Sequence, residues 1–139
     1  MTTPPRIGQV WPHQGGVYAG LVRGTAGGPD QHLILAAALP PKRLAWAAAK
    51  KWAAAVRDEG HKDFSLPTRD ESALLYANVR DQVEAGWYWT GTQYSAGDAW
   101  FQYFGNGLQG RVVKSYEARA RAVRRFAAES FNPSDAAPE

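Results

Sequence analysis

The amino-acid sequence predicts a single-domain protein of the α+β class. Two stretches have apolar residues at helical spacing, and the segments before and after them have the apolar composition or the two-residue alternation of β-strands. The chain has 139 residues, of which 45% are hydrophobic and 21% charged, as in an ordinary globular domain. We therefore expect one core that combines two helices with antiparallel strands.

A β-hairpin is predicted near the start of the chain. Residues 17–24 and 32–39 are apolar, and glycine, proline and aspartate separate them, which is typical of a turn between two strands. The first ten residues contain two prolines and few apolar side chains, so we expect residues 1–14 to be a flexible segment. Residues 127–139 are likewise expected to form a flexible tail, which leaves residues 15–126 as the domain.

Two amphipathic helices are predicted after the hairpin. The first covers residues 42–59, between a pair of prolines and Gly60. Its proposed stripe, at four-residue spacing, is Leu44, Ala48, Trp52 and Val56. The second helix begins at Thr68, whose hydroxyl caps it while Glu71 reaches back to complete a capping box. Its proposed buried stripe is Leu75, Val79 and Val83.

Three strands are predicted after Gly86, where the sequence period changes to two. They cover residues 87–93, 98–104 and 109–114, and glycine lies in both turns between them, so we expect an antiparallel meander. The last segment, 117–129, is ambiguous, because alanine and arginine favour a helix whereas the alternation weakly favours a strand. The side chains expected to share one core are Trp52, Leu66, Leu75, Val79, Trp89 and Trp100.

Few residues suit catalysis or metal binding. The absence of cysteine excludes disulfides, thiolate metal sites and cysteine nucleophiles. The three histidines do not lie at metal-ligand spacing, no serine lies in a GxSxG motif, and no glycine-rich phosphate loop is present. Asp70 and Glu71 lie in the first turn of the predicted second helix, where carboxylates stabilise the helix end. We therefore expect a non-enzymatic protein with no cofactor and no metal.

Aromatic side chains are concentrated in the predicted meander. The chain has six Trp, six Tyr and five Phe, and those of the meander fall on both faces of its strands. One face is expected to cover the helices. The other face is either a second buried layer under the N-terminal loops or a stacking surface for a sugar or a protein. The candidate ligand-binding residues in this group are Trp87, Tyr88, Tyr94, Trp100 and Tyr103.

Basic residues are concentrated in the last third of the chain. Within fifteen positions, 111–125, six basic residues stand against Glu117 alone, a net charge of +5. Such a stretch suits an acidic partner, with nucleic acid possible but not favoured, or it is a solvated face with ion pairs to the second helix. The candidate ligand-binding residues in this group are Arg111, Lys114, Arg121 and Arg124.

Four motifs follow one another in a recognisable order. They are residues 63–71 (DFSLPTRDE), residues 88–92 (YWTGT), Ala99-Trp100 with residues 104–107 (FGNG), and residues 121–124 (RAVR). This series resembles the small C-type-lectin-like domains of bacteria and phages, which include the C-terminal domain of collagen-like adhesins and their phage and prophage relatives.

The resemblance implies a particular fold and a binding role. It implies a C-type-lectin-like fold in which two helices flank a twisted antiparallel sheet and the N- and C-terminal strands are adjacent. It would make residues 120–126 a strand. In that family the activity is binding, and no set of catalytic residues carries over to this chain. Calcium-dependent sugar-binding members use a Trp-Asn-Asp segment that is missing here, so binding is expected to be independent of calcium.

Two functions of different classes are therefore expected. The first is a non-enzymatic binding module of phage or prophage type, which is virion-associated or recognises a host surface glycan or protein. The alternative is a small cytoplasmic inhibitor that blocks a host protein or nucleoprotein through the basic C-terminal stretch. No membrane-spanning run and no secretory signal are present, so we expect a virion or host-cytoplasm location. No oligomeric state is predicted.

Overall fold

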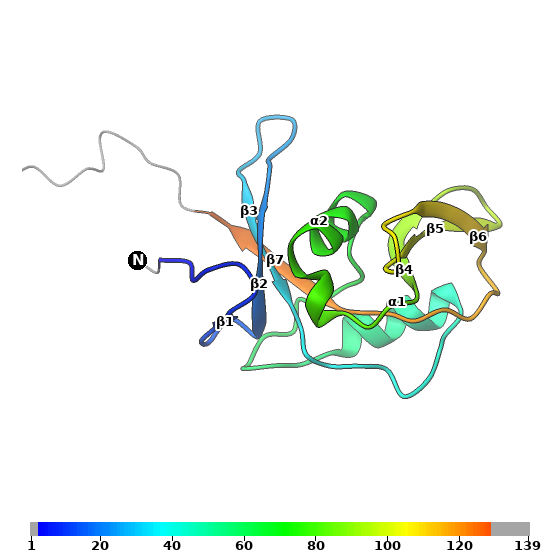
Figure 1. The fold of residues 1–139 in the computed structure, drawn as a ribbon, viewed down its shortest axis with the longest axis horizontal. Helices are drawn as coiled ribbons and strands as arrows, with labels where there is room; N and C mark the ends of the chain where they lie inside the picture. Colours follow the sequence, from blue (N-terminus) through cyan, green and yellow to red (C-terminus); the bar gives the residue numbers. More distant parts are fainter. Residues whose placement is uncertain (1–2, 129–139) are drawn as a thin grey trace, which may run out of the picture.

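Two helices and two antiparallel sheets form the protein, which confirms the α+β class (Figure 1). The computed structural model describes residues 3–128. The strands are β1 (Val10–Trp11), β2 (Gly16–Val22), β3 (Gln31–Leu35), β4 (Trp87–Gln93), β5 (Asp98–Tyr103), β6 (Gln109–Val113) and β7 (Val123–Ala127). The helices are α1 (Trp46–Ala55), α2 (Arg69–Val79) and the short 3₁₀ turn η1 (Arg80–Gln82).

The strands form two sheets where the sequence resemblance implied one. The first sheet has the order β1-β2-β3-β7 and the second the order β4-β5-β6, with α2 between them in Figure 1. The predicted hairpin (β2 and β3) and the predicted meander (β4 to β6) are confirmed. The C-terminal strand β7 pairs with β3, whereas β1 lies at the opposite edge of that sheet. The specific C-type-lectin-like arrangement therefore stays a prediction.

The ambiguous segment near the C-terminus contains the strand β7. It pairs antiparallel with all five residues of β3, from Leu35 opposite Val123 to Gln31 opposite Ala127. The exposed edge of the hairpin supplies the backbone partners that override the helical preference of alanine and arginine. Of the tail expected over residues 127–139, Ala127 belongs to β7, and residues 129–139 lie outside the described part of the chain.

The segment expected to be flexible at the N-terminus contributes to the core where it is described. Val10 and Trp11 pair with β2, and Trp11 is buried. The Trp11 ring packs against Tyr18 and Phe126, with ring centroids 5.1 and 5.3 Å apart. This tryptophan therefore anchors the segment to the first sheet.

The helix α1 is shorter than predicted, and its predicted stripe is only partly confirmed: Val56 is buried and Leu44 and Trp52 are partly buried, but Ala48 is exposed. It begins at Trp46 and ends at Ala55, and its buried side chains are Trp46, Ala49 and Ala53. Because alanine lies on every side of this helix, apolar spacing alone does not identify the buried face. The buried face is set by Trp46, whose indole N–H donates a 2.9 Å hydrogen bond to the Thr90 carbonyl. Gly60 does not end the helix but occupies a tight turn with φ +82°.

The helix α2 confirms the predicted start and buried stripe. The Glu71 backbone N–H donates to Thr68 Oγ1 at 3.1 Å, and the Thr68 N–H donates to Glu71 Oε1 at 2.9 Å. Leu75, Val79 and Val83 are buried, although α2 ends at Val79 and Val83 follows η1. The capping box therefore forms as predicted.

The segment between β6 and β7 connects the two sheets. Ala118 exchanges backbone hydrogen bonds with Leu44, and Arg119 does the same with the start of β4. Ala122 then accepts a hydrogen bond from the Ala36 N–H at 3.0 Å, and Val123 exchanges hydrogen bonds with Ser65. The order of these contacts along residues 118–123 fixes the position of every side chain in the segment.

The core is divided, and this corrects the prediction of a single cluster. Leu66 and Trp89 lie in a cluster with α1, where Trp52 is only partly buried, whereas Leu75 and Val79 lie in another with β2 and β3. Trp100 belongs to neither cluster: it is half-buried, and the guanidinium of Arg69 on α2 stacks on its ring. Within residues 3–128, no helix has the combination of length and apolar composition that crossing a bilayer requires.

Candidate functional site

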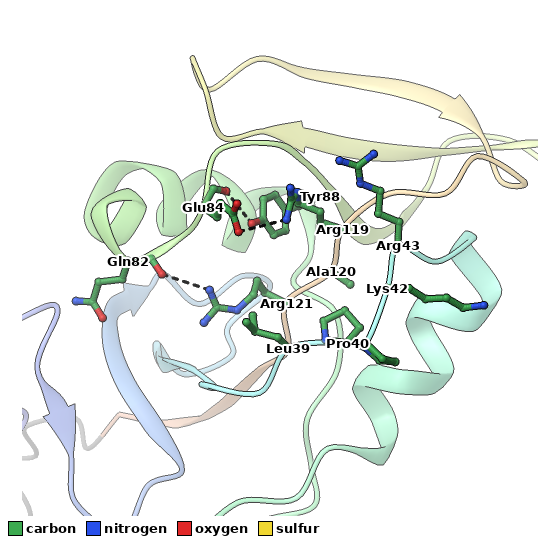
Figure 2. Close-up of a pocket in the computed structure, with 11 residues that line it drawn as sticks. Leu39, Pro40, Lys42, Arg43, Gln82, Glu84, Tyr88, Arg119, Ala120 and Arg121 are labelled. Carbon is green, nitrogen blue, oxygen red and sulfur yellow. Dashed lines mark hydrogen bonds and ion pairs between the residues drawn. The ribbon is translucent and has the colours of Figure 1, made fainter.

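A cavity of about 380 Å³ opens between three segments that meet at the junction of the two sheets (Figure 2). Its walls come from the loop before α1 (39–43), the segment between α2 and β4 (82–88), and residues 119–121. The cationic residues that line it are Lys42, Arg43, Arg119 and Arg121, and the carboxylate is that of Glu84. Positive charge therefore exceeds negative charge around this cavity.

Arg121 lies at the base of this cavity and is 9% exposed. Its Nη1 donates to the Gln82 carbonyl at 3.4 Å (Figure 2). Its Nη2 donates to the Ala36 carbonyl at 2.8 Å. Its Nε–H is buried and has no acceptor among the described atoms. No carboxylate in residues 3–128 lies within ion-pair distance of it. Burial lowers the pKa of this guanidinium, because the two carbonyls compensate only partly for the water that its charged form loses.

Arg119 lies on the rim of the cavity. Its Nη1 is 3.3 Å from Glu84 Oε2, and because the Glu84 side chain is 75% exposed, this ion pair only weakly neutralises the arginine. The Arg119 side chain lies against Gly86, where a Cβ atom would be 2.7 Å from Arg119 Nε. Gly86, at φ +153°, therefore allows a close approach that another residue would block.

Tyr88 and the two cations before α1 complete the walls. The Tyr88 ring is buried, and its hydroxyl donates to the Glu84 backbone carbonyl at 2.7 Å. Burial raises the pKa of this phenol. In Figure 2, Arg43 stands at the rim, whereas Lys42 extends away from Arg121. Arg121, Arg119 and Arg43 are therefore the cations placed to contact a molecule in the cavity.

Two further cavities continue from the first along residues 116–121. A middle cavity of about 230 Å³ shares Arg43 and Arg119 with the Arg121 cavity. An end cavity of about 310 Å³ shares Trp87, Tyr116 and Ala118 with the middle one. Because neighbouring cavities share lining residues, we treat the series, from a cationic end at Arg121 to an apolar end at Trp87, as one groove. We call it the 116–121 groove.

The predicted aromatic residues do not form a single surface. Trp87 and Tyr103 share one face of the meander, with ring centroids 4.8 Å apart. Tyr94 and Trp100 contact each other edge to face at 5.3 Å, apart from that pair. The guanidinium of Arg69 stacks 3.6 Å from the centroid of the Trp100 ring. The second group is therefore already covered in part by a cation of this chain.

The predicted basic residues are also separated. Arg111 lies over the Tyr94 ring at 4.4 Å and pairs with Asp98 at 3.5 Å. Lys114 Nζ donates to the Gln93 side chain at 2.6 Å and to the Ala96 carbonyl at 2.8 Å.

Arg124 belongs to a different part of the fold again. It is buried, with Nε 2.9 Å from Asp63 Oδ1 and Nη1 donating to the Gln14 carbonyl at 2.9 Å. Its donors therefore hold two loops together inside the protein, and of the four predicted basic residues only Arg121 faces the Arg121 cavity.

Sequence reasoning brought Tyr88 and Arg121 into the candidate site but missed Arg43 and Arg119 as their neighbours. Arg119 was part of the basic stretch and was not singled out. Arg43 follows Pro40-Pro41-Lys42, and a dibasic pair after two prolines was the available signal for cations on an exposed loop.

Comparisons with known proteins do not name a ligand for this site. No protein-family model and no curated protein sequence matches the chain. Residues 3–128 contain no group of three or more His, Asp or Glu side chains placed to hold one metal ion. The inference of function therefore rests on the geometry around Arg121.

Proposed function

We propose that this protein is a non-enzymatic binding module that holds an anionic group of its ligand in the Arg121 cavity. The observation that supports this proposal is the buried guanidinium of Arg121, which has no carboxylate partner and an unused Nε–H in the described chain. An anion entering the cavity supplies the missing negative charge, and Arg119 and Arg43 at the rim add to the attraction.

The buried charge of Arg121 has an energetic cost that the protein only partly compensates. Removing a charged side chain from water costs several kcal/mol after relaxation, and a nearby opposite charge recovers part of that cost. In the unliganded protein two backbone carbonyls give only partial compensation for Arg121. Binding of a carboxylate or phosphate group is therefore favoured at this point more than at an exposed arginine, which water already solvates.

The positions of the basic residues favour ligand binding in a local cavity over ligand binding on a broad cationic surface. Arg111, Lys114 and Arg124 have partners of their own in three different places. A long polyanion that needs all of them on one face therefore fits less well than a ligand with one acidic group. The phage or prophage assignment, calcium independence and the virion or cytoplasmic location stay predictions.

The test uses small anions as probes. In ¹⁵N-labelled protein at constant ionic strength, sodium acetate and sodium phosphate are titrated against sodium chloride while the arginine Nε–H resonances are recorded. We expect the Arg121 Nε–H signal to shift in a saturable way with acetate or phosphate. The matched control is Arg80→Met, which removes an exposed arginine and should keep this response, whereas Arg121→Met should remove the saturable shifts of the residues around the cavity. An Arg121 signal that ignores both anions overturns the proposal.

A further inference from the structure

The apolar end of the 116–121 groove exposes two large aromatic side chains. Trp87 is 41% exposed and Tyr116 is 44% exposed, and they face a cavity lined by Phe101, Val112 and Ala118. Trp87 also packs edge to face on Phe101, with ring centroids 4.5 Å apart. Large apolar rings around a hollow suit the insertion of another apolar side chain.

This apolar cavity and the Arg121 cavity lie within reach of one short ligand. The residues that border both ends, Tyr116 and Arg121, are five positions apart, so their Cα atoms are separated by at most about 17 Å. The middle cavity, with Arg43 and Arg119, joins the two ends. A chain of a few residues in extended conformation therefore spans the groove.

The chemistry along the groove identifies the class of ligand. Its apolar end offers the rings of Trp87 and Phe101 and the methyl groups of Val112, which suit a hydrocarbon better than the hydroxyl groups of a sugar. The charged residue at this end, Arg111, already pairs with Asp98 and lies over the Tyr94 ring. The middle cavity includes Glu117, and Glu84 lies at the cationic end, so negative charge interrupts the path that a nucleic-acid backbone would follow. The pattern is one anion site followed by one apolar site.

We propose that the ligand is a polypeptide segment of a partner protein. The segment places an Asp or Glu side chain at Arg121 and a large apolar side chain in the cavity beside Trp87 and Tyr116. This inference rests on the proposed function, because the acidic side chain is the anionic group assigned there to Arg121. It adds the class of partner and the second contact.

The inference is tested with synthetic peptides. The series is acetyl-Glu-(Gly)n-Phe-amide with one to four glycines, beside matched peptides in which Gln replaces Glu or Gly replaces Phe. Binding is followed by the Arg121 Nε–H and Trp87 indole N–H resonances. For at least one spacer length we expect both signals to shift together. The affinity of that peptide should exceed the affinities of both matched peptides by tenfold or more.

Two variants separate the ends of the groove. Tyr116→Ala should abolish the gain in peptide affinity that the Phe side chain provides. The shift of the Arg121 Nε–H signal with acetate should persist. Leu108→Ala is the matched control, because Leu108 is a large apolar side chain that is 57% exposed and lines none of the three cavities. Leu108→Ala should therefore leave the gain in affinity from Phe intact.

Each remaining outcome has a defined meaning. If Arg121 responds to acetate and to the acidic peptides but Phe adds nothing at any spacer length, the polypeptide inference is wrong and the proposed function stands. If no acid shifts the Arg121 signal, both fail. If a single-stranded oligothymidylate binds more tightly than every peptide and shifts both signals, the polypeptide class is wrong and a nucleic-acid ligand replaces it.

Discussion

Arg125 on β7 is joined to Glu71 on α2 by two hydrogen bonds, from Nε to Oε2 at 2.6 Å and from Nη2 to Oε1 at 2.9 Å. Glu71 is 4% exposed, and its Oε1 also accepts the hydrogen bond from the Thr68 N–H that closes the capping box. A single carboxylate therefore both caps α2 and fixes that helix to the first sheet. Arg125, one of the arginines in the basic stretch, therefore stabilises the fold.

Replacing Arg125 by Met should destabilise the protein by about 3 kcal/mol, measured by urea unfolding. The substitution leaves Glu71 buried and without its cation, and breaking a buried pair in this way costs roughly 3–5 kcal/mol. The lower end applies because the Arg125 side chain is 26% exposed. The double variant Arg125→Met with Glu71→Gln should recover part of the loss, and a single variant as stable as wild type would contradict the assignment.

Replacing Arg121 by Met should have a different effect on stability. No carboxylate among the described residues loses an ion-pair partner in this variant. An apolar side chain of similar length also avoids the cost of burying a charge. The lost hydrogen bond to the Ala36 carbonyl offsets this gain, so we expect a change within about 1 kcal/mol in either direction. A loss as large as that of Arg125→Met would mean that Arg121 is a structural residue.

Replacing Thr68 by Ala should destabilise the protein by about 0.5–2 kcal/mol, because the Glu71 backbone N–H loses its acceptor at the start of α2. The anion response of Arg121 should remain unchanged, since Thr68 lines none of the three cavities of the 116–121 groove. Thermal unfolding and the acetate titration test the two statements separately. Loss of the anion response at unchanged stability would assign this motif to the binding site.

Replacing Trp89 by Ala should destabilise the protein by about 3–5 kcal/mol, the usual range for truncating a buried large aromatic side chain. Trp89 is fully buried in the cluster with α1, and its indole Nε1 donates to the Leu44 carbonyl at 2.7 Å. Trp87→Ala is the comparison on the same strand. Because Trp87 is 41% exposed, its truncation should cost clearly less, and equal losses would contradict the placement of the two rings.

The pair of Asp63 and Arg124 should make stability depend on pH in the acid range. Burial raises the pKa of Asp63, but the hydrogen bond and the charge of Arg124 outweigh it, so the net pKa lies below its ordinary value. A carboxyl with a depressed pKa in the folded state stabilises the protein above its unfolded-state pKa, about 3.9, and loses that contribution as the pH falls through the folded-state value. The stability difference between wild type and Asp63→Asn should therefore be largest near neutral pH and shrink below about pH 4. A difference that stays constant down to pH 2 would contradict this linkage.

Features encoded by neighbouring residues were predictable from the sequence. The capping box needs only Thr68 and Glu71 at fixed spacing, and the meander needs only glycine turns between alternating segments. The face of α1 was not predictable, because alanine is small on every side and the anchor is the distant contact of Trp46 with Thr90. The division of the core likewise depends on which helix packs on which sheet.

The candidate site was only partly predictable for the same reason. Arg121, Arg124 and Arg125 are nearly adjacent in the chain, yet they face the Arg121 cavity, Asp63 and Glu71 respectively. Arg124 and Arg125 alternate along β7 and bind partners more than fifty positions away, whereas Arg121 lies before that strand. The composition located the basic stretch. Only the folded structure shows that Arg124 and Arg125 pair with carboxylates, whereas Arg121 has no carboxylate partner among the described residues.

The connecting segment 118–123 also imposes an order on folding during synthesis. It bonds in turn to residues near 44, 88, 36 and 65, so the long-range contacts that join the two sheets form only after the strands β1 to β6 have been made. Until those residues leave the ribosome, the edge of β3 has no β7 beside it, and an unpaired strand edge is prone to bind other chains. The nascent protein therefore depends on β7, rather than on the hairpin of β2 and β3 alone, to avoid association with other chains through this edge.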